Sequence, residues 1–122
     1  MFTLDYILLA VKNPRESAKV YDRILGVAPV ENSETFVLYV LPNGFKVGLW
    51  QATEMEPAPK PVGGSELSFS MADNDSVTKT YEDWKTLGLK IEQTPTEMDF
   101  GFTFVASDAD GHRLRPFAPA PR

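Results

Sequence analysis

Few residues of this sequence have the types and spacing that catalysis or metal binding needs. The chain has one histidine, His112, and no cysteine, which excludes disulfide bonds, thiol nucleophiles and thiolate metal sites. His112 stands in a turn beside Gly111 with no second histidine near it in the sequence, so a structural role is its simpler interpretation. The remaining candidates for chemistry are carboxylate, guanidinium and aromatic side chains.

Trp50 is the first aromatic candidate for a ligand contact. It follows Gly48 by two residues, and side chains alternate along a strand, so both positions are expected on one face. The residues between and before them, 45, 47 and 49, would then face a helix. We interpret the Trp50 ring as a flat surface on which an aromatic ligand could stack. The alternative is that Trp50 makes a packing contact or a dimer contact.

Other aromatic and basic residues are weaker candidates. Phe100 precedes the last hairpin and is expected either to fold over a ligand or to pack under that hairpin. Tyr39 and Lys46 are further candidates for lining a cavity, although alternation alone does not fix which face of a strand points inward. Trp84 and Tyr81 recur at helical spacing and are expected in the core.

Two predicted hairpins organise the elements that must position these residues. Asn43-Gly44 and Asp110-Gly111 supply their turns, because such pairs adopt the positive φ angles that tight hairpins need. A strand and a helix ending in glycine precede each hairpin. The expected helices are residues 14–25 and the segment from about 76 to 87, and a loop is expected at 95–99. The expected strands are 4–11, 27–31, 36–41, 45–50, 66–72, 89–93 and the two arms of 102–117.

The pattern therefore predicts an α+β fold with a duplicated βαβββ module. The first module would span residues 1–50 and the second 65–122, within a single domain of 1–122. Residues 51–64 contain alternating prolines and a Gly-Gly pair, which is typical of an extended linker.

Composition narrows the class of partner. The chain has 122 residues, 43% of them hydrophobic, and a net charge of -5. This indicates a globular protein with enough apolar material for a core, and it argues against binding to nucleic acid or an anionic membrane. The N-terminus resembles no signal peptide and no apolar run reaches membrane-spanning length, so we expect a complete cytoplasmic protein.

Three stretches resemble the vicinal oxygen chelate superfamily, which includes glyoxalases, bleomycin-resistance proteins and extradiol dioxygenases. They are residues 4–26, the helix that ends at Gly88, and residues 107–117, whose Asp-Ala-Asp-Gly turn is similar to the Asp-Pro-Asp-Gly hairpin of that family. The resemblance implies that each module curls into a half-barrel, that two modules face one another around a concave cavity, and that the protein is a homodimer that exchanges modules.

The resemblance also identifies the positions where metal-using relatives hold their ion. Here they carry Tyr6, Gly48, Glu66 and Arg115. Glu66 alone is an ordinary anionic ligand, and the permanent positive charge of Arg115 would repel a cation. We therefore expect no metal, no cofactor and no catalytic residue, and we predict an ion pair between Glu66 and Arg115 instead.

Among metal-free members, the sequence resembles antibiotic-binding resistance proteins, especially those for phenazine-type or bleomycin-type compounds. The hypothesis is a small-molecule binder that sequesters a planar aromatic antibiotic and confers resistance. One alternative is a lyase, isomerase or dioxygenase of the same superfamily that works with acid–base residues such as Glu66, Tyr6 and His112. Another is a partner-binding module whose cavity is filled by its own side chains.

Overall fold

The computed structural model describes residues 2–121, and the chain divides between Pro61 and Val62 into two compact units. We call residues up to 61 unit 1 and residues from 62 unit 2. Each unit holds one helix and one four-stranded sheet. The α+β class and the two βαβββ modules are thereby confirmed. Within the described residues, no helix is both long and apolar enough to span a membrane.

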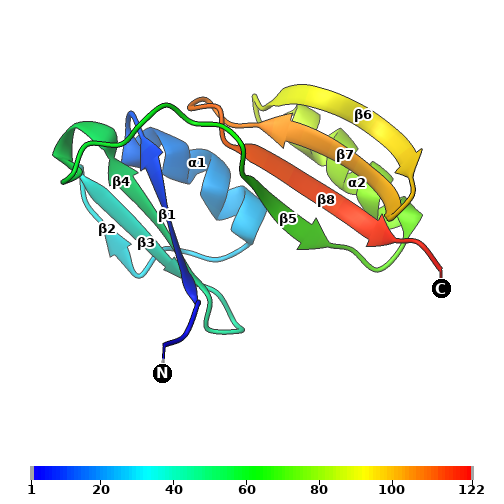
Figure 1. Cartoon of the computed structure of the whole chain (residues 1–122), viewed down its shortest axis with the longest axis horizontal. Helices are drawn as coiled ribbons and strands as arrows, with labels where there is room; N and C mark the ends of the chain where they lie inside the picture. Colours follow the sequence, from blue (N-terminus) through cyan, green and yellow to red (C-terminus); the bar gives the residue numbers. More distant parts are fainter. Residues whose placement is uncertain (1, 122) are drawn as a thin grey trace. The chain divides into compact units, whose positions relative to one another are not determined.

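Unit 1 is a mixed sheet with one helix on one face (Figure 1). Its strands lie in the order β1-β4-β3-β2, with β1 parallel to β4 and the other pairs antiparallel. Its elements are β1 (Tyr6–Val11), α1 (Pro14–Leu25), β2 (Glu31–Asn32), β3 (Phe36–Val40), β4 (Lys46–Gln51) and a short 3-10 turn, Ala52–Glu54.

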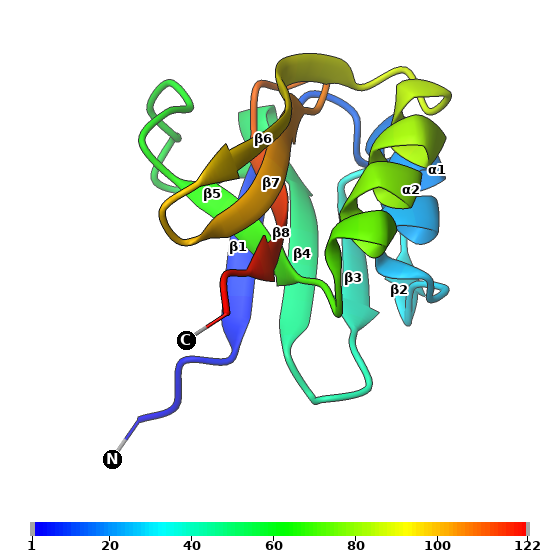
Figure 2. The ribbon, with the colours of Figure 1, turned by 90° about the vertical axis from the view of Figure 1, so that its right-hand side faces the viewer.

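Local sequence signals set the ends of these elements. The side chain of Asn13 accepts a hydrogen bond from the backbone N–H of Glu16 at 3.2 Å and so caps the start of α1. Gly26 ends the helix in the left-handed conformation, with φ of 69°. Gly44 has φ of 89° in the turn that joins β3 to β4, which stands at the bottom of Figure 2.

The core of unit 1 lies between α1 and the sheet. The buried side chains there are Leu9, Val11, Ala18, Tyr21, Val37, Tyr39, Val47 and Leu49. The Tyr39 hydroxyl donates a hydrogen bond to Asp22 Oδ1 at 2.6 Å, and Asp22 belongs to α1. Tyr39 is fully buried on the helix side of β3, so the prediction that it lines a cavity is wrong.

Unit 2 repeats this plan, with strand order β5-β8-β7-β6 and β5 parallel to β8. Its elements are β5 (Glu66–Ser70), α2 (Asn74–Lys85), β6 (Lys90–Met98), β7 (Gly101–Ser107) and β8 (Arg113–Pro119). Trp84 and Tyr81 of α2 meet the ring of Phe104 edge to face, each with ring centroids 5.4 Å apart. These two aromatic residues therefore belong to the helix–sheet packing, as predicted.

The largest differences from the predicted boundaries lie at β6, at β2 and in the linker. Strand β6 runs through Pro95, where a loop was expected, because β6 is an edge strand with register shifts around this proline. Pro lacks an N–H, which such an edge tolerates. Strand β2 is limited to Glu31–Asn32, later than expected, and the linker begins with the 3-10 turn rather than an extended chain.

Candidate functional site

Each sheet has one face covered by its helix and an opposite face that the helix leaves uncovered. We call the latter the helix-free face of each unit. In unit 1, strand alternation and the registered pairs place on it Tyr6, Leu8, Ala10, Phe36, Leu38, Val40, Lys46, Gly48 and Trp50. This face is mostly apolar yet partly exposed, as the exposed fractions of Tyr6 (37%), Leu8 (44%) and Val40 (38%) show.

Trp50 lies on this face as the alternation argument predicts. Its ring meets Phe36 edge to face, with centroids 6.3 Å apart, and Phe36 is its registered partner on β3. Gly48 is buried between its neighbours, because a Cβ at that position would lie 2.8 Å from Leu8 Cδ2 and 3.1 Å from Phe36 Cε1. Its missing side chain lets Leu8 and Phe36 close over β4, so these side chains block the ligand contact expected at Gly48.

Tyr6 and Lys46 form a registered pair on the same face. Lys46 Nζ stands 6.0 Å from the centroid of the Tyr6 ring and forms an ion pair with Asp5 at 3.1 Å. Burial, with a smaller effect of the Glu31 charge, raises the pKa of the Tyr6 hydroxyl above its ordinary value. Tyr6 is therefore a neutral phenol near pH 7 and a poor general base.

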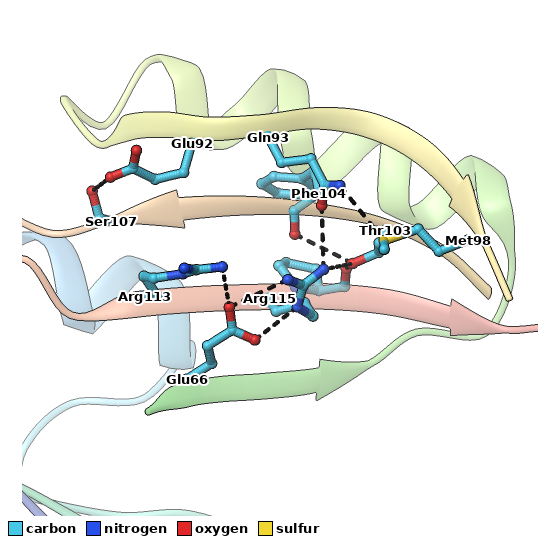
Figure 3. Close-up of polar contacts among 10 residues, drawn as sticks. Glu66, Glu92, Gln93, Met98, Thr103, Phe104, Ser107, Arg113 and Arg115 are labelled. Carbon is cyan, nitrogen blue, oxygen red and sulfur yellow. Dashed lines mark hydrogen bonds and ion pairs between the residues drawn. The ribbon is translucent and has the colours of Figure 1, made fainter. Parts of the chain in front are cut away.

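Unit 2 carries a charged cluster on its helix-free face. Arg115 Nε donates to Glu66 Oε1 at 2.8 Å and Arg115 Nη2 donates to Glu66 Oε2 at 3.2 Å (Figure 3). This two-point contact confirms the predicted ion pair, and its cause is the parallel pairing of β5 with β8. Arg113 also forms an ion pair with Glu66, so one carboxylate joins two guanidinium groups.

The remaining contacts of Arg115 fix its side chain. Its Nη1 donates to Gln93 Oε1 at 3.2 Å and lies 3.5 Å from the Thr103 hydroxyl oxygen. The Phe100 ring lies over the guanidinium group, with 5.8 Å from Cζ to the ring centroid, and also meets Phe117 at 5.9 Å. Phe100 thus lies near Arg115 and keeps 45% of its surface exposed.

The sequence interpretation missed three members of this cluster. Arg113 could have been identified, because it precedes Arg115 by two residues and so shares its face. Gln93 and Thr103 could not, because their approach depends on the pairing of β6, β7 and β8. His112 lies in the turn between β7 and β8, where its backbone N–H donates to Asp108 Oδ1 at 2.8 Å.

The donor set does not fit a divalent metal ion. Glu66 is the one anion among the four positions, and hydrogen bonding from Arg115 holds the pKa of its carboxyl below the usual value. Both carboxylate oxygens accept from guanidinium groups, so a cation would have to displace Arg115 and tolerate Arg113. Across residues 2–121 no group of three or more His, Asp or Glu side chains is placed to hold a metal.

The chain consists of two βαβββ units, and in each unit the first and last strands pair in parallel. This arrangement places it in the class of small proteins that are built from paired βαβββ modules. The chain belongs to the Glyoxalase/Bleomycin resistance protein/Dioxygenase superfamily, whose family model matches residues 3–115.

Individual relatives support this assignment. The chain is 27% identical over 111 residues to the phenazine antibiotic resistance protein EhpR of Enterobacter agglomerans. The aligned residues cover 88% of this chain and 85% of EhpR. It is 45% identical to protein ATC0852 from Agrobacterium tumefaciens, with a TM-score of 0.90 to its solution NMR structure and coverage of 99% and 100%. A glyoxalase-related enzyme from Fulvimarina pelagi has the same fold, with a TM-score of 0.86, 19% identity and coverage of 97% and 88%.

Proposed function

We propose that this protein is a metal-free, cytoplasmic, homodimeric binding protein that sequesters a planar aromatic compound, a phenazine-like or bleomycin-like antibiotic, and so confers resistance. The observation that carries the proposal is the partly exposed aromatic surface of Trp50 and Phe36 on the helix-free face of unit 1. Flat rings gain from stacking on such surfaces in addition to the area they bury. The likeness to a phenazine antibiotic resistance protein suggests the ring system.

The charged cluster favours binding over acid–base catalysis. A general base must take up a proton near the working pH, but the pKa of Glu66 is lowered by its hydrogen bonds with Arg115. The pKa of Tyr6 is raised. A tyrosine that acts as a general base would need a pKa lowered toward the working pH, so this shift makes Tyr6 a poorer base. These shifts weaken the alternative of an enzyme that relies on Glu66 and Tyr6.

The homodimer is proposed from the apolar surface of unit 1. Tyr6, Leu8 and Val40 each keep more than a third of their surface exposed on one face of a sheet, and contiguous apolar surface of this kind favours association. Light scattering at micromolar concentration tests this part, and a monomeric mass would refute the homodimer.

The two tryptophans allow a direct test of ligand binding. Trp50 lies on the helix-free face of unit 1, whereas Trp84 is 6% exposed and packs against Phe104. Titration of phenazine should quench the tryptophan fluorescence of the Trp84→Phe variant, in which Trp50 is the remaining tryptophan, more strongly than that of Trp50→Phe. Calorimetry on Trp50→Ala should show binding at least about tenfold weaker than wild type.

Trp84→Phe is the matched control, because it also removes one tryptophan but leaves the proposed ligand surface at Trp50 unchanged. A change in quenching that is seen only in Trp50→Phe therefore reports lost binding and not the loss of a fluorophore. If no planar aromatic compound binds wild type at up to about 1 mM, which corresponds to roughly 4 kcal/mol, sequestration is refuted. Equal affinity of Trp50→Ala and wild type would show that the ligand binds elsewhere.

A further inference from the structure

The Glu66–Arg113–Arg115 cluster has one more positive than negative charge. Glu66 supplies one negative charge, and the two guanidinium groups supply two positive charges. The whole chain has a net charge of -5, so this cationic spot stands out from its surroundings. A local excess of one positive charge on an acidic protein suits a single monovalent anion.

The two arginines differ in how many of their donors the protein already uses. Arg115 is 16% exposed and its three nitrogens all have acceptors, on Glu66, Gln93 and Thr103. Arg113 is 47% exposed, and within residues 2–121 its guanidinium contacts one acceptor residue, Glu66. A guanidinium group has five N–H donors, so Arg113 retains several for another molecule.

A pocket of about 350 Å³ lies beside these donors. It is lined by Gly64, Ser65, Glu66, Ser68 and Arg113, all in unit 2. The serine hydroxyls add neutral hydrogen-bond donors, and Glu66 orients the Arg113 fork from one side, as Figure 3 shows. A carboxylate fits the fork geometry of Arg and carries the single charge that the cluster lacks, whereas a phosphate dianion exceeds it.

An aromatic surface lies on the same face of the same unit. Phe100 packs over the Arg115 guanidinium and against Phe117, and Arg113, Arg115 and Phe117 alternate along β8. Cationic and aromatic contacts therefore follow one another along a single strand. This combination selects a ring that carries an acidic group rather than a neutral ring.

We infer that Arg113 and the pocket beside it bind the carboxylate of an aromatic acid, so that the ligand class is planar aromatic carboxylates. The inference takes from the proposed function only that the ligand is a planar aromatic compound. The binding residues that it names all belong to unit 2, so the Trp50→Ala test of unit 1 is independent of it. It assigns a specificity role to Arg113, which contacts the ligand, and a positioning role to Glu66, which holds the Arg113 fork.

The test compares two ligands that share one ring system and nearly one shape, phenazine-1-carboxylate and phenazine-1-carboxamide. At low salt, wild type should bind the carboxylate about tenfold more tightly than the amide. In Arg113→Gln this ratio should fall to about one, chiefly because the affinity for the carboxylate falls. High salt should reduce the wild-type ratio.

Arg15→Gln is the matched control, because Arg15 is exposed on α1 in unit 1 and its replacement removes the same charge. This variant should keep the wild-type ratio. A ratio that falls equally in both variants would assign the effect to net charge and overturn a specific role of Arg113. In the NMR spectrum of wild type, the Arg113 Nε–H resonance should shift on addition of the carboxylate and not of the amide.

The outcomes separate this inference from the proposed function. If both compounds bind wild type with equal affinity, the aromatic binder stands and the carboxylate inference is wrong. If neither compound binds at concentrations up to about 1 mM, the proposed function fails and the inference fails with it.

Discussion

Removal of the Glu66 carboxylate should destabilise unit 2 in a way that depends on pH. In Glu66→Gln, Arg115 would lose its two-point contact, and Arg113 and Arg115 would face one another without the anion between them. Arg115 is 16% exposed, so water replaces the lost partner only in part. Breaking a buried pair from one side costs about 3 to 5 kcal/mol, whereas exposed pairs are worth about 1 kcal/mol or less.

Partial exposure places this pair between those limits. Glu66 is 26% exposed, and Arg115 would keep Gln93 and Thr103 as neighbours. We therefore expect Glu66→Gln to lower the free energy of unfolding by about 2 kcal/mol at pH 7. For a chain of this size that loss corresponds to a fall in Tm of about 6 to 8 °C.

The sign of the pH dependence follows from the lowered pKa of Glu66. Its carboxyl group has a lower pKa in the folded protein than its usual 4.5, chiefly because Arg115 donates hydrogen bonds to it. The stabilisation is therefore complete well above pH 4.5 and is lost as the pH falls through the folded pKa. The difference between wild type and Glu66→Gln should shrink across that acidic range.

Urea denaturation at pH 7 and at steps below pH 5 measures this difference. Glu97→Gln serves as the control, because Glu97 is exposed on β6 and the exchange of a carboxylate for an amide is the same. If Glu66→Gln and Glu97→Gln unfold at the same urea concentration at pH 7, the ion pair contributes no stability and the reasoning fails. A difference that stays constant at acid pH would refute the assignment to the Glu66 charge.

Three further changes test the packing within each unit. Tyr39→Phe should lower the free energy of unfolding, measured by urea denaturation, by about 1 to 2 kcal/mol, because it removes the partly buried hydrogen bond of 2.6 Å to Asp22. An unchanged free energy would show that this bond is not formed in solution. Trp84→Ala should cost about 3 to 5 kcal/mol in the same assay, because it empties the aromatic core of unit 2, whereas a fall in phenazine affinity without a fall in stability would contradict its core role. Gly101→Ala should lower Tm clearly, because φ there is 149° and an added Cβ would collide with the Ala118 carbonyl oxygen; an unchanged Tm would contradict the close approach of β7 and β8.

Much of the fold could be predicted because its signals are local. Asn13 and Gly26 mark the ends of α1 through a side-chain hydrogen bond and a positive φ angle, and both effects involve only neighbouring residues. Gly44 and Gly111 mark the hairpin turns for the same reason. The shared face of Trp50 and Gly48 followed from the two-residue period of a strand, which needs no knowledge of the strand's partners.

The errors lie where long-range pairing decides. Tyr39 could be assigned to the wrong face because alternation tells which residues share a face but not which face the helix covers. Pro95 could be placed in a loop because its tolerance in β6 depends on β6 being an edge strand.

The sequence by itself determined the duplicated βαβββ plan and the turns, since residue type and spacing suffice for both. Tertiary structure alone decided that Gln93 and Thr103 join the pair of Glu66 and Arg115. It also decided that Leu8 and Phe36 fill the space above Gly48. The physical reason is that these contacts cross between strands. Only the hydrogen-bonded register of β1 and β3 with β4, and of the strand pairs β5–β8, β8–β7 and β7–β6, brings their side chains within reach.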